Sequence, residues 1–113
     1  MTKTTEILID GFTFTEGPRW HEGRLYFSDF FTHRVLAVDT KGQHETIVKT
    51  PCQPSGLGWL PDGSLLIVSM NDQKLLHFDN GVLTEAADLS ELATHYCNDM
   101  VVDKSGNAYI GNF

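Results

Sequence analysis

The chain has few cysteines, few basic residues and no long apolar run, and each shortage excludes a class of protein. It holds 8 Lys and Arg residues against 15 Asp and Glu residues, which gives a formal net charge of −7. Nucleic acid and anionic membranes bind basic surfaces, so we expect neither as a partner. No stretch approaches the roughly 18 apolar residues that a membrane helix needs. The polar N-terminus, Met1–Glu6, has no apolar signal core behind it.

The chain also lacks the motifs of several enzyme classes. It contains no glycine-rich phosphate loop, no G-x-S-x-G elbow and no H-E-x-x-H segment. Its 5 histidines fit no metal spacing, and we expect them to have surface or loop roles. The 2 cysteines, Cys52 and Cys97, lie far apart without a C-x-x-C partner. They indicate reduced thiols in a cytoplasmic protein, not a disulfide framework or a zinc knuckle.

What the chain does contain is a repeat. The segment from Gly23 to Asp39 aligns without a gap on the segment from Gly63 to Asp79, at an offset of 40 residues. A third copy begins at Asn98, at an offset of 43 residues from the second. Each repeat alternates glycine-bearing turns with short runs of branched or aromatic residues, which predicts a four-stranded antiparallel sheet. A period of about 40 residues with this content is typical of β-propeller blades.

We therefore predict an all-β fold made of propeller blades, in a single partial domain over residues 1–113. The repeats cover approximately residues 12–52, 53–96 and 97–113, or about two and a half blades. Because a closed propeller takes at least about four blades, we expect the chain to be truncated. Open sheet edges would then favour self-association. Only residues 88–95 have a helical pattern, one or two turns long.

The repeat also indicates a functional position, because equivalent residues of successive blades lie at the same height around one axis. Four residues before the anchors Trp20, Trp59 and Val102 stand Glu16, Ser55 and Asn98. We expect these three side chains to converge on the central channel.

Glu16 and Asn98 are the candidate metal ligands. A carboxylate and a carboxamide are hard oxygen ligands of the kind that Ca²⁺ and Mg²⁺ prefer. The alternative is structural, since a Glu before Gly-Pro can simply lie exposed at a turn, and Asn-Asp is a common turn pair.

The residues around Glu16 and Asn98 have structural roles in our interpretation. We interpret Ser55 as channel lining, Asp99 as a structural hydrogen-bond acceptor, Cys97 as a buried core thiol, and Trp20, Trp59, Phe30 and Phe31 as aromatics that pack the blades.

Three ordered motifs add a family resemblance. Residues 15–20 (TEGPRW), 55–63 (SGLGWLPDG) and 98–103 (NDMVVD) with 111–113 (GNF) resemble the blade signatures of the gluconolactonase/regucalcin (senescence marker protein) family. The resemblance implies a six-bladed propeller with one divalent cation in the channel. It implies that Glu16 is the first metal ligand and that Asn98 contacts metal or substrate.

The same resemblance implies that the other ligands, an Asn and an Asp that doubles as general base, belong to later blades. We therefore expect no catalytic residue in this segment. Tyr96 stands where members that act on sugar lactones often place an arginine, which leaves the substrate open.

The function that follows is a divalent-metal-dependent hydrolase of the gluconolactonase type, acting on a small-molecule lactone or ester. Ca²⁺ is the expected ion, with Mg²⁺, Zn²⁺ and Mn²⁺ as alternatives, and the 113-residue piece alone is expected to be inactive. Two other hypotheses remain, a non-catalytic binding scaffold and a half-propeller that closes by self-association. A scaffold has no need of Glu16 and Asn98 in the same repeat phase, which favours the hydrolase.

Overall fold

All regular secondary structure in the computed structural model, which describes residues 3–113, is β-strand. The predicted all-β class is confirmed. The helical pattern of residues 88–95 does not become a helix: the amide N–H groups of Leu92 and Ala93 both donate to the Leu89 carbonyl, which closes a single turn. The strands are β1 (Thr15–His21), β2 (Arg24–Asp29), β3 (Arg34–Val38), β4 (His44–Lys49), β5 (Pro54–Trp59), β6 (Leu65–Ser69), β7 (Lys74–Asp79), β8 (Val82–Asp88), β9 (Cys97–Val102) and β10 (Ala108–Asn112).

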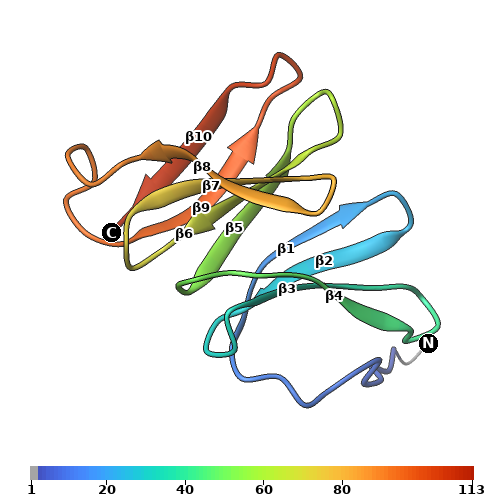
Figure 1. Ribbon diagram of the computed structural model, residues 1–113. Coiled ribbons are helices and arrows are strands. Elements are labelled where there is room, and N and C mark those ends of the chain that lie inside the picture. The colour runs from blue at the N-terminus through green and yellow to red at the C-terminus, as the bar shows by residue number, and fades with distance from the viewer. Residues whose placement is uncertain (1–2) are drawn as a thin grey trace.

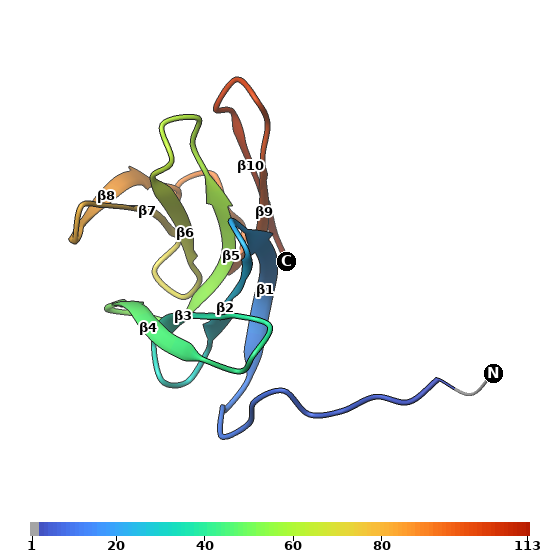
Figure 2. The ribbon, with the colours of Figure 1, turned by 90° about the vertical axis from the view of Figure 1, so that its right-hand side faces the viewer.

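The strands form two four-stranded antiparallel sheets and one hairpin. Strands β1 to β4 make the first sheet in chain order, β5 to β8 make the second, and β9 pairs with β10. The first strand of each sheet lies beside the first strand of the next, so that β1, β5 and β9 are neighbours, as Figures 1 and 2 show. The later strands of each sheet step outward from this inner row. This is the arrangement expected for successive blades around one axis.

Equivalent hydrogen bonds show that the three sheets repeat one another in detail. At the same end of each sheet, a backbone N–H just after the second strand donates to a carbonyl just before the first strand. The three bonds run from Phe30 N to Phe14 O (2.9 Å), from Met70 N to Gln53 O (2.9 Å) and from Phe113 N to Tyr96 O (3.2 Å).

The core lies between the sheets. Successive side chains of a strand point to opposite faces, so a strand between two neighbours must be apolar on both faces. This explains the continuous run at residues 65–68: Leu65 and Ile67 pack toward the first sheet, whereas Leu66 and Val68 pack toward the β9–β10 hairpin. Cys97 is fully buried in the second of these interfaces, as predicted, and both cysteines are free.

The two tryptophans differ, and the prediction for Trp20 is wrong. Trp59 packs between the sheets, stacked on His21 at 3.9 Å and edge-on to Tyr26 at 4.9 Å. Trp20, its repeat equivalent, is 61% exposed. The physical reason is that Trp59 stacks on a residue of the preceding sheet, and within residues 3–113 no sheet precedes β1. Phe31 is equally exposed, although Phe30 and Phe31 do pack on Phe14.

Close contact between the inner strands depends on glycine. A Cβ atom added to Gly56 of β5 would lie 2.7 Å from the backbone nitrogen of Met100 and 2.9 Å from the Asn98 carbonyl oxygen in β9. A Cβ on Gly17 of β1 would lie 2.5 Å from the Ser55 carbonyl oxygen, and the φ of +61° at Gly17 independently favours glycine. Because the atoms opposed to these sites belong to the backbone, a side chain could be accommodated only by moving a strand.

Substitution of Gly56 tests this packing. We expect Gly56→Ala to lower the free energy of unfolding by about 1–3 kcal/mol, because the added methyl group forces β5 and β9 apart. The matched control is Gly111→Ala in β10, where the nearest atom to an added Cβ is 3.9 Å away. The control should change stability by less than about 1 kcal/mol. Urea denaturation measures both, and equal effects of the two substitutions would contradict the close-approach argument.

Candidate functional site

Two of the three predicted channel residues are in direct contact. The Ser55 hydroxyl of β5 donates a hydrogen bond to the Asn98 side-chain oxygen of β9, at 2.9 Å. Ser55 is 1% exposed, so water can hardly compete with Asn98 for this hydroxyl. The bond fixes which end of the Asn98 amide faces β5. One lone pair of Oδ1 and both N–H groups of Nδ2 are left for other partners.

Glu16 lies one strand away on β1 and is not hydrogen-bonded to either residue. It pairs in register with Ser28 of β2, and the Ser28 hydroxyl donates to the Ser55 carbonyl oxygen at 2.7 Å. The register shifts between Glu16 and Arg19, where Gly17 adopts its positive φ. The Glu16 side chain is half-buried and borders an apolar pocket beneath the N-terminal segment. The structure therefore places Glu16, Ser55 and Asn98 on three adjacent inner strands, where Ser55 and Asn98 are hydrogen-bonded to each other.

Sequence reasoning missed Arg19, which spans all three inner strands. Its Nη2 donates to the Asp99 carboxylate at 3.0 Å and to the Met100 carbonyl at 2.7 Å, so β1 is joined directly to β9. Asp99 also accepts from the Met100 N–H at 2.7 Å, in the structural acceptor role predicted for it. The glycines of β5 were the sequence feature that could have indicated this contact. Gly56 lets β9 approach closely enough for the Arg19 guanidinium to reach it.

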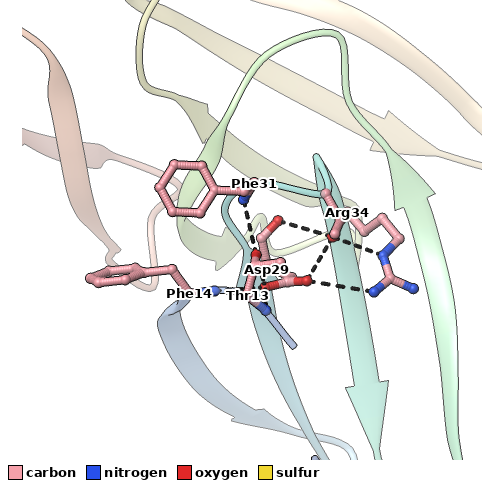
Figure 3. A network of polar contacts seen from close by, with 6 residues as sticks. Thr13, Phe14, Asp29, Phe31 and Arg34 are labelled. Carbon is pink, nitrogen blue, oxygen red and sulfur yellow. Dashed lines mark hydrogen bonds and ion pairs between the residues drawn. The ribbon is translucent and has the colours of Figure 1, made fainter. Parts of the chain in front are cut away.

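A buried carboxylate holds the start of β1. The Asp29 side chain at the end of β2 is completely buried, and Figure 3 shows the polar contacts that converge on it. It accepts from Thr13 N–H (2.9 Å), the Thr13 hydroxyl (2.7 Å), Phe14 N–H (3.0 Å) and the Thr32 hydroxyl (2.6 Å), and it pairs with Arg34 at 3.5 Å. Asp29 thus fixes the segment that enters β1, directly before the strand that carries the candidate ligand.

The same contacts decide the charge of Asp29. Burial alone would raise the pKa of its carboxyl group, but the hydrogen bonds from Thr32, Thr13 and the Phe14 backbone outweigh burial and lower the pKa to about 2. Asp29 is therefore an ionised anchor at neutral pH. It does not face the Ser55–Asn98 contact, and its acceptor sites are occupied, so it is a structural residue rather than a general base.

A second polar cluster resembles a catalytic triad but has the wrong order. His77 Nε2 lies 2.9 Å from the Ser64 hydroxyl, a contact that sequence reasoning did not anticipate. The Ser64 hydroxyl, however, donates to the Asp62 carboxylate at 2.5 Å. Histidine must then donate to serine, so it cannot act as the base that removes the serine proton. The cluster stabilises the β5–β6 turn.

Comparison with known proteins assigns the family. The family model described as "SMP-30/Gluconolactonase/LRE-like region" matches residues 14–113. The chain belongs to this family. The resemblance inferred from the three motifs is thereby confirmed, whereas the roles of Glu16 and Asn98 remain predictions. No curated protein sequence matches the chain significantly. No helix long and apolar enough to cross a membrane occurs between residues 3 and 113.

Solved structures support the fold. A gluconolactonase of Xanthomonas campestris is similar with a TM-score of 0.79 at 20% sequence identity, over 93% of this chain and 37% of that one. A Bacteroides thetaiotaomicron protein of unknown function is similar with a TM-score of 0.69 at 20% identity, over 79% of this chain and 30% of that one. The chain thus spans about a third of the length of these relatives. The Xanthomonas enzyme is a β-propeller, which confirms the predicted blade architecture.

The Asp29 anchor predicts a pH dependence of stability. The usual carboxyl pKa of 3.8 is lowered to about 2 on folding, so the stabilisation is complete above pH 4 and is lost as the pH falls to about 2. We expect wild type to lose about 2 kcal/mol of unfolding free energy over this window relative to Asp29→Asn. Asp10→Asn is the control, since Asp10 is exposed and its side chain has no hydrogen-bond partner within residues 3–113. Urea denaturation at several pH values measures the effect, and parallel curves for wild type and Asp29→Asn would contradict it.

Proposed function

We propose that the protein is a divalent-metal-dependent hydrolase of the gluconolactonase type, which opens a lactone or ester of a small molecule. The observation that carries this proposal is the Ser55–Asn98 hydrogen bond beside the strand that bears Glu16. Three residues in the same repeat phase carry a carboxylate, a hydroxyl and an amide on the adjacent inner strands β1, β5 and β9. Membership of a family that includes gluconolactonase supports the reaction class.

The donor set suits a hard cation. Glu16 and Asn98 offer oxygen atoms, which Ca²⁺ prefers and which Mg²⁺ or Mn²⁺ also accept. A zinc site of the thiolate or imidazole type is less well supported, because the two candidate ligands, Glu16 and Asn98, carry oxygen donors and neither sulfur nor imidazole nitrogen. Burial also raises the pKa of the Cys97 thiol, which keeps it protonated and a poor ligand. Glu16 and Asn98 therefore fit part of a calcium coordination sphere.

A bound divalent cation would supply Lewis-acid polarisation of a carbonyl oxygen. Glu16 would neutralise positive charge at the channel, and Asn98 would use the Oδ1 lone pair that Ser55 leaves free. The Ser55 hydroxyl holds the amide so that its Nδ2 group can donate to a substrate oxygen. Arg19 keeps the backbone after Asn98 in place through Asp99 and Met100. Asn98 can thus contact both metal and substrate, whereas Ser55 only positions it.

Removal of the Glu16 charge tests the ligand assignment. We expect Glu16→Gln to weaken Ca²⁺ binding on the order of 10- to 100-fold or more, because a metal ligand contributes at least as much as its supporting residues. The matched control is Glu45→Gln, which removes the same charge from β4, where Glu45 pairs with Arg24 at 2.8 Å. Isothermal titration with Ca²⁺, and in parallel with Mg²⁺, Zn²⁺ and Mn²⁺, measures the affinity. If both variants bind these ions as wild type does, Glu16 is not a ligand and the scaffold alternative gains support.

Removal of the metal tests the reaction. We expect EDTA to abolish hydrolysis of a lactone such as δ-gluconolactone by the full-length protein, and added Ca²⁺ to restore it, because the carbonyl loses its polarising group. A pH-stat assay follows the acid released. The control is an equal addition of EDTA already saturated with Ca²⁺. Hydrolysis that persists in EDTA would refute the metal-dependent reaction.

A further inference from the structure

A second set of repeat-equivalent residues lies directly before the candidate site. Phe14, Gln53 and Tyr96 stand two positions ahead of Glu16, Ser55 and Asn98. They are equivalent in structure as well as in sequence, because their carbonyl groups accept the three corresponding hydrogen bonds at the ends of the sheets. Each of them stands directly before the first residue of β1, β5 or β9, and the hydrogen bond at its carbonyl extends the strand pairing by one residue. Alternation along that extension predicts that its side chain lies on the face of the polar residue two positions later. We call Phe14, Gln53 and Tyr96 the upper tier.

Two of the three members of the upper tier are large, exposed aromatics. Phe14 is 52% exposed and Tyr96 is 40% exposed. Each is held by further rings that come from the end of its own sheet, as Figure 3 shows for Phe14 and Phe31, which both point away from Arg34. Phe31 lies 6.3 Å from Phe14, and Phe113 lies 6.4 Å from Tyr96. The rings are therefore ordered by their neighbours while their outer faces stay open.

The order of tiers along the inner strands is chemically informative. Glu16, Ser55 and Asn98 supply charge and hydrogen bonds, whereas Phe14 and Tyr96 one step further out supply mainly apolar ring surface. A ligand with hydroxyl groups on every carbon can stack only a C–H face on such a ring while its hydroxyls stay in water, so it covers less apolar ring surface than an alkyl or aryl group does. A ligand with a polar end and an apolar end would match both tiers.

We propose that Phe14 and Tyr96 bind the apolar substituent of the substrate, which makes the preferred substrate class a lactone or ester that bears an alkyl or aryl group. This inference rests on the proposed function, because it assumes that the reacting carbonyl lies at the tier of Asn98. The ester bond reacts at the polar tier, and the substituent lies along the rings. The open faces of Phe14 and Tyr96 are then covered when the ligand binds.

Binding can be tested apart from turnover with a ketone that cannot be hydrolysed. The probe is a pentyl-substituted cyclopentanone, which keeps a ring carbonyl and an alkyl chain. We expect it to bind wild type and to bind Phe14→Ser and Tyr96→Ser on the order of ten-fold more weakly, which corresponds to about 1.4 kcal/mol. Tyr96→Phe keeps the ring and should bind as wild type does. Trp20→Ser is the matched control, since it removes an even more exposed aromatic from the far end of β1.

Titrations followed by ¹H–¹⁵N NMR give the affinity and show whether the amide signals near residues 14 and 96 shift. Failure of the ketone to bind, or equal binding by wild type and both Ser variants, would overturn the inference. Relative kcat/KM values of the full-length protein for δ-decalactone and δ-gluconolactone separate the apolar subsite from the proposed function. A preference for δ-gluconolactone would overturn the apolar subsite and leave the hydrolase standing. Ketone binding that depends on the two rings, without turnover of either lactone, would leave the apolar subsite standing and overturn the hydrolase.

Discussion

The close approach of the inner strands is the constraint on which the other features depend. Strands β1, β5 and β9 come together without side chains at Gly17 and Gly56, where an added Cβ would meet backbone atoms at 2.5 and 2.7 Å. This spacing brings Ser55 within hydrogen-bond distance of Asn98 and lets Arg19 reach from β1 to β9. An alanine in either position would separate the strands and break both contacts. The polar site is therefore a consequence of packing that the glycines permit.

The two ends of each sheet use polar side chains for different purposes. At the end away from the site, turn aspartates bind backbone N–H groups nearby in sequence, as Asp39 does with Lys41 and Gln43 and Asp103 does with Ser105 and Asn107. These local bonds stabilise single turns. At the site end, Asp88 likewise binds the Ser90 N–H in a local turn, but the Ser55–Asn98 and Thr13–Asp29 bonds join residues 43 and 16 positions apart. An end stabilised by long-range contacts holds side chains of different sheets in fixed relation, which a ligand site needs.

The repeat explains why much of the fold could be predicted from sequence. Features that are not repeated explain why Trp20 and Arg19 could not. An offset of 40 residues with glycine-bearing turns predicts blades, and the equivalence of Glu16, Ser55 and Asn98 follows from it. Trp20 was mispredicted because burial depends on the neighbouring sheet, which the repeat does not describe. Arg19 was missed because its partners lie 80 and 81 residues away on β9. A residue that occurs in only one repeat leaves no periodic signal.

The first two repeats differ at one buried position, and the difference shows that β1 is held more firmly than β5. Asp29 and Ser69 are equivalent, since each pairs with the first residue of its inner strand and with the first residue of its third strand. Asp29 has its carboxylate bonded on several sides, whereas the buried hydroxyl of Ser69 has no partner within residues 3–113. The stronger anchor thus holds the strand that carries Glu16, and the weaker one serves β5, whose Ser55 carries no charge. A carboxylate that must stay beside a hard cation requires a firmly held backbone, because coordination tolerates little displacement. The asymmetry of two otherwise equivalent blades is what a site with its charge on β1 would require.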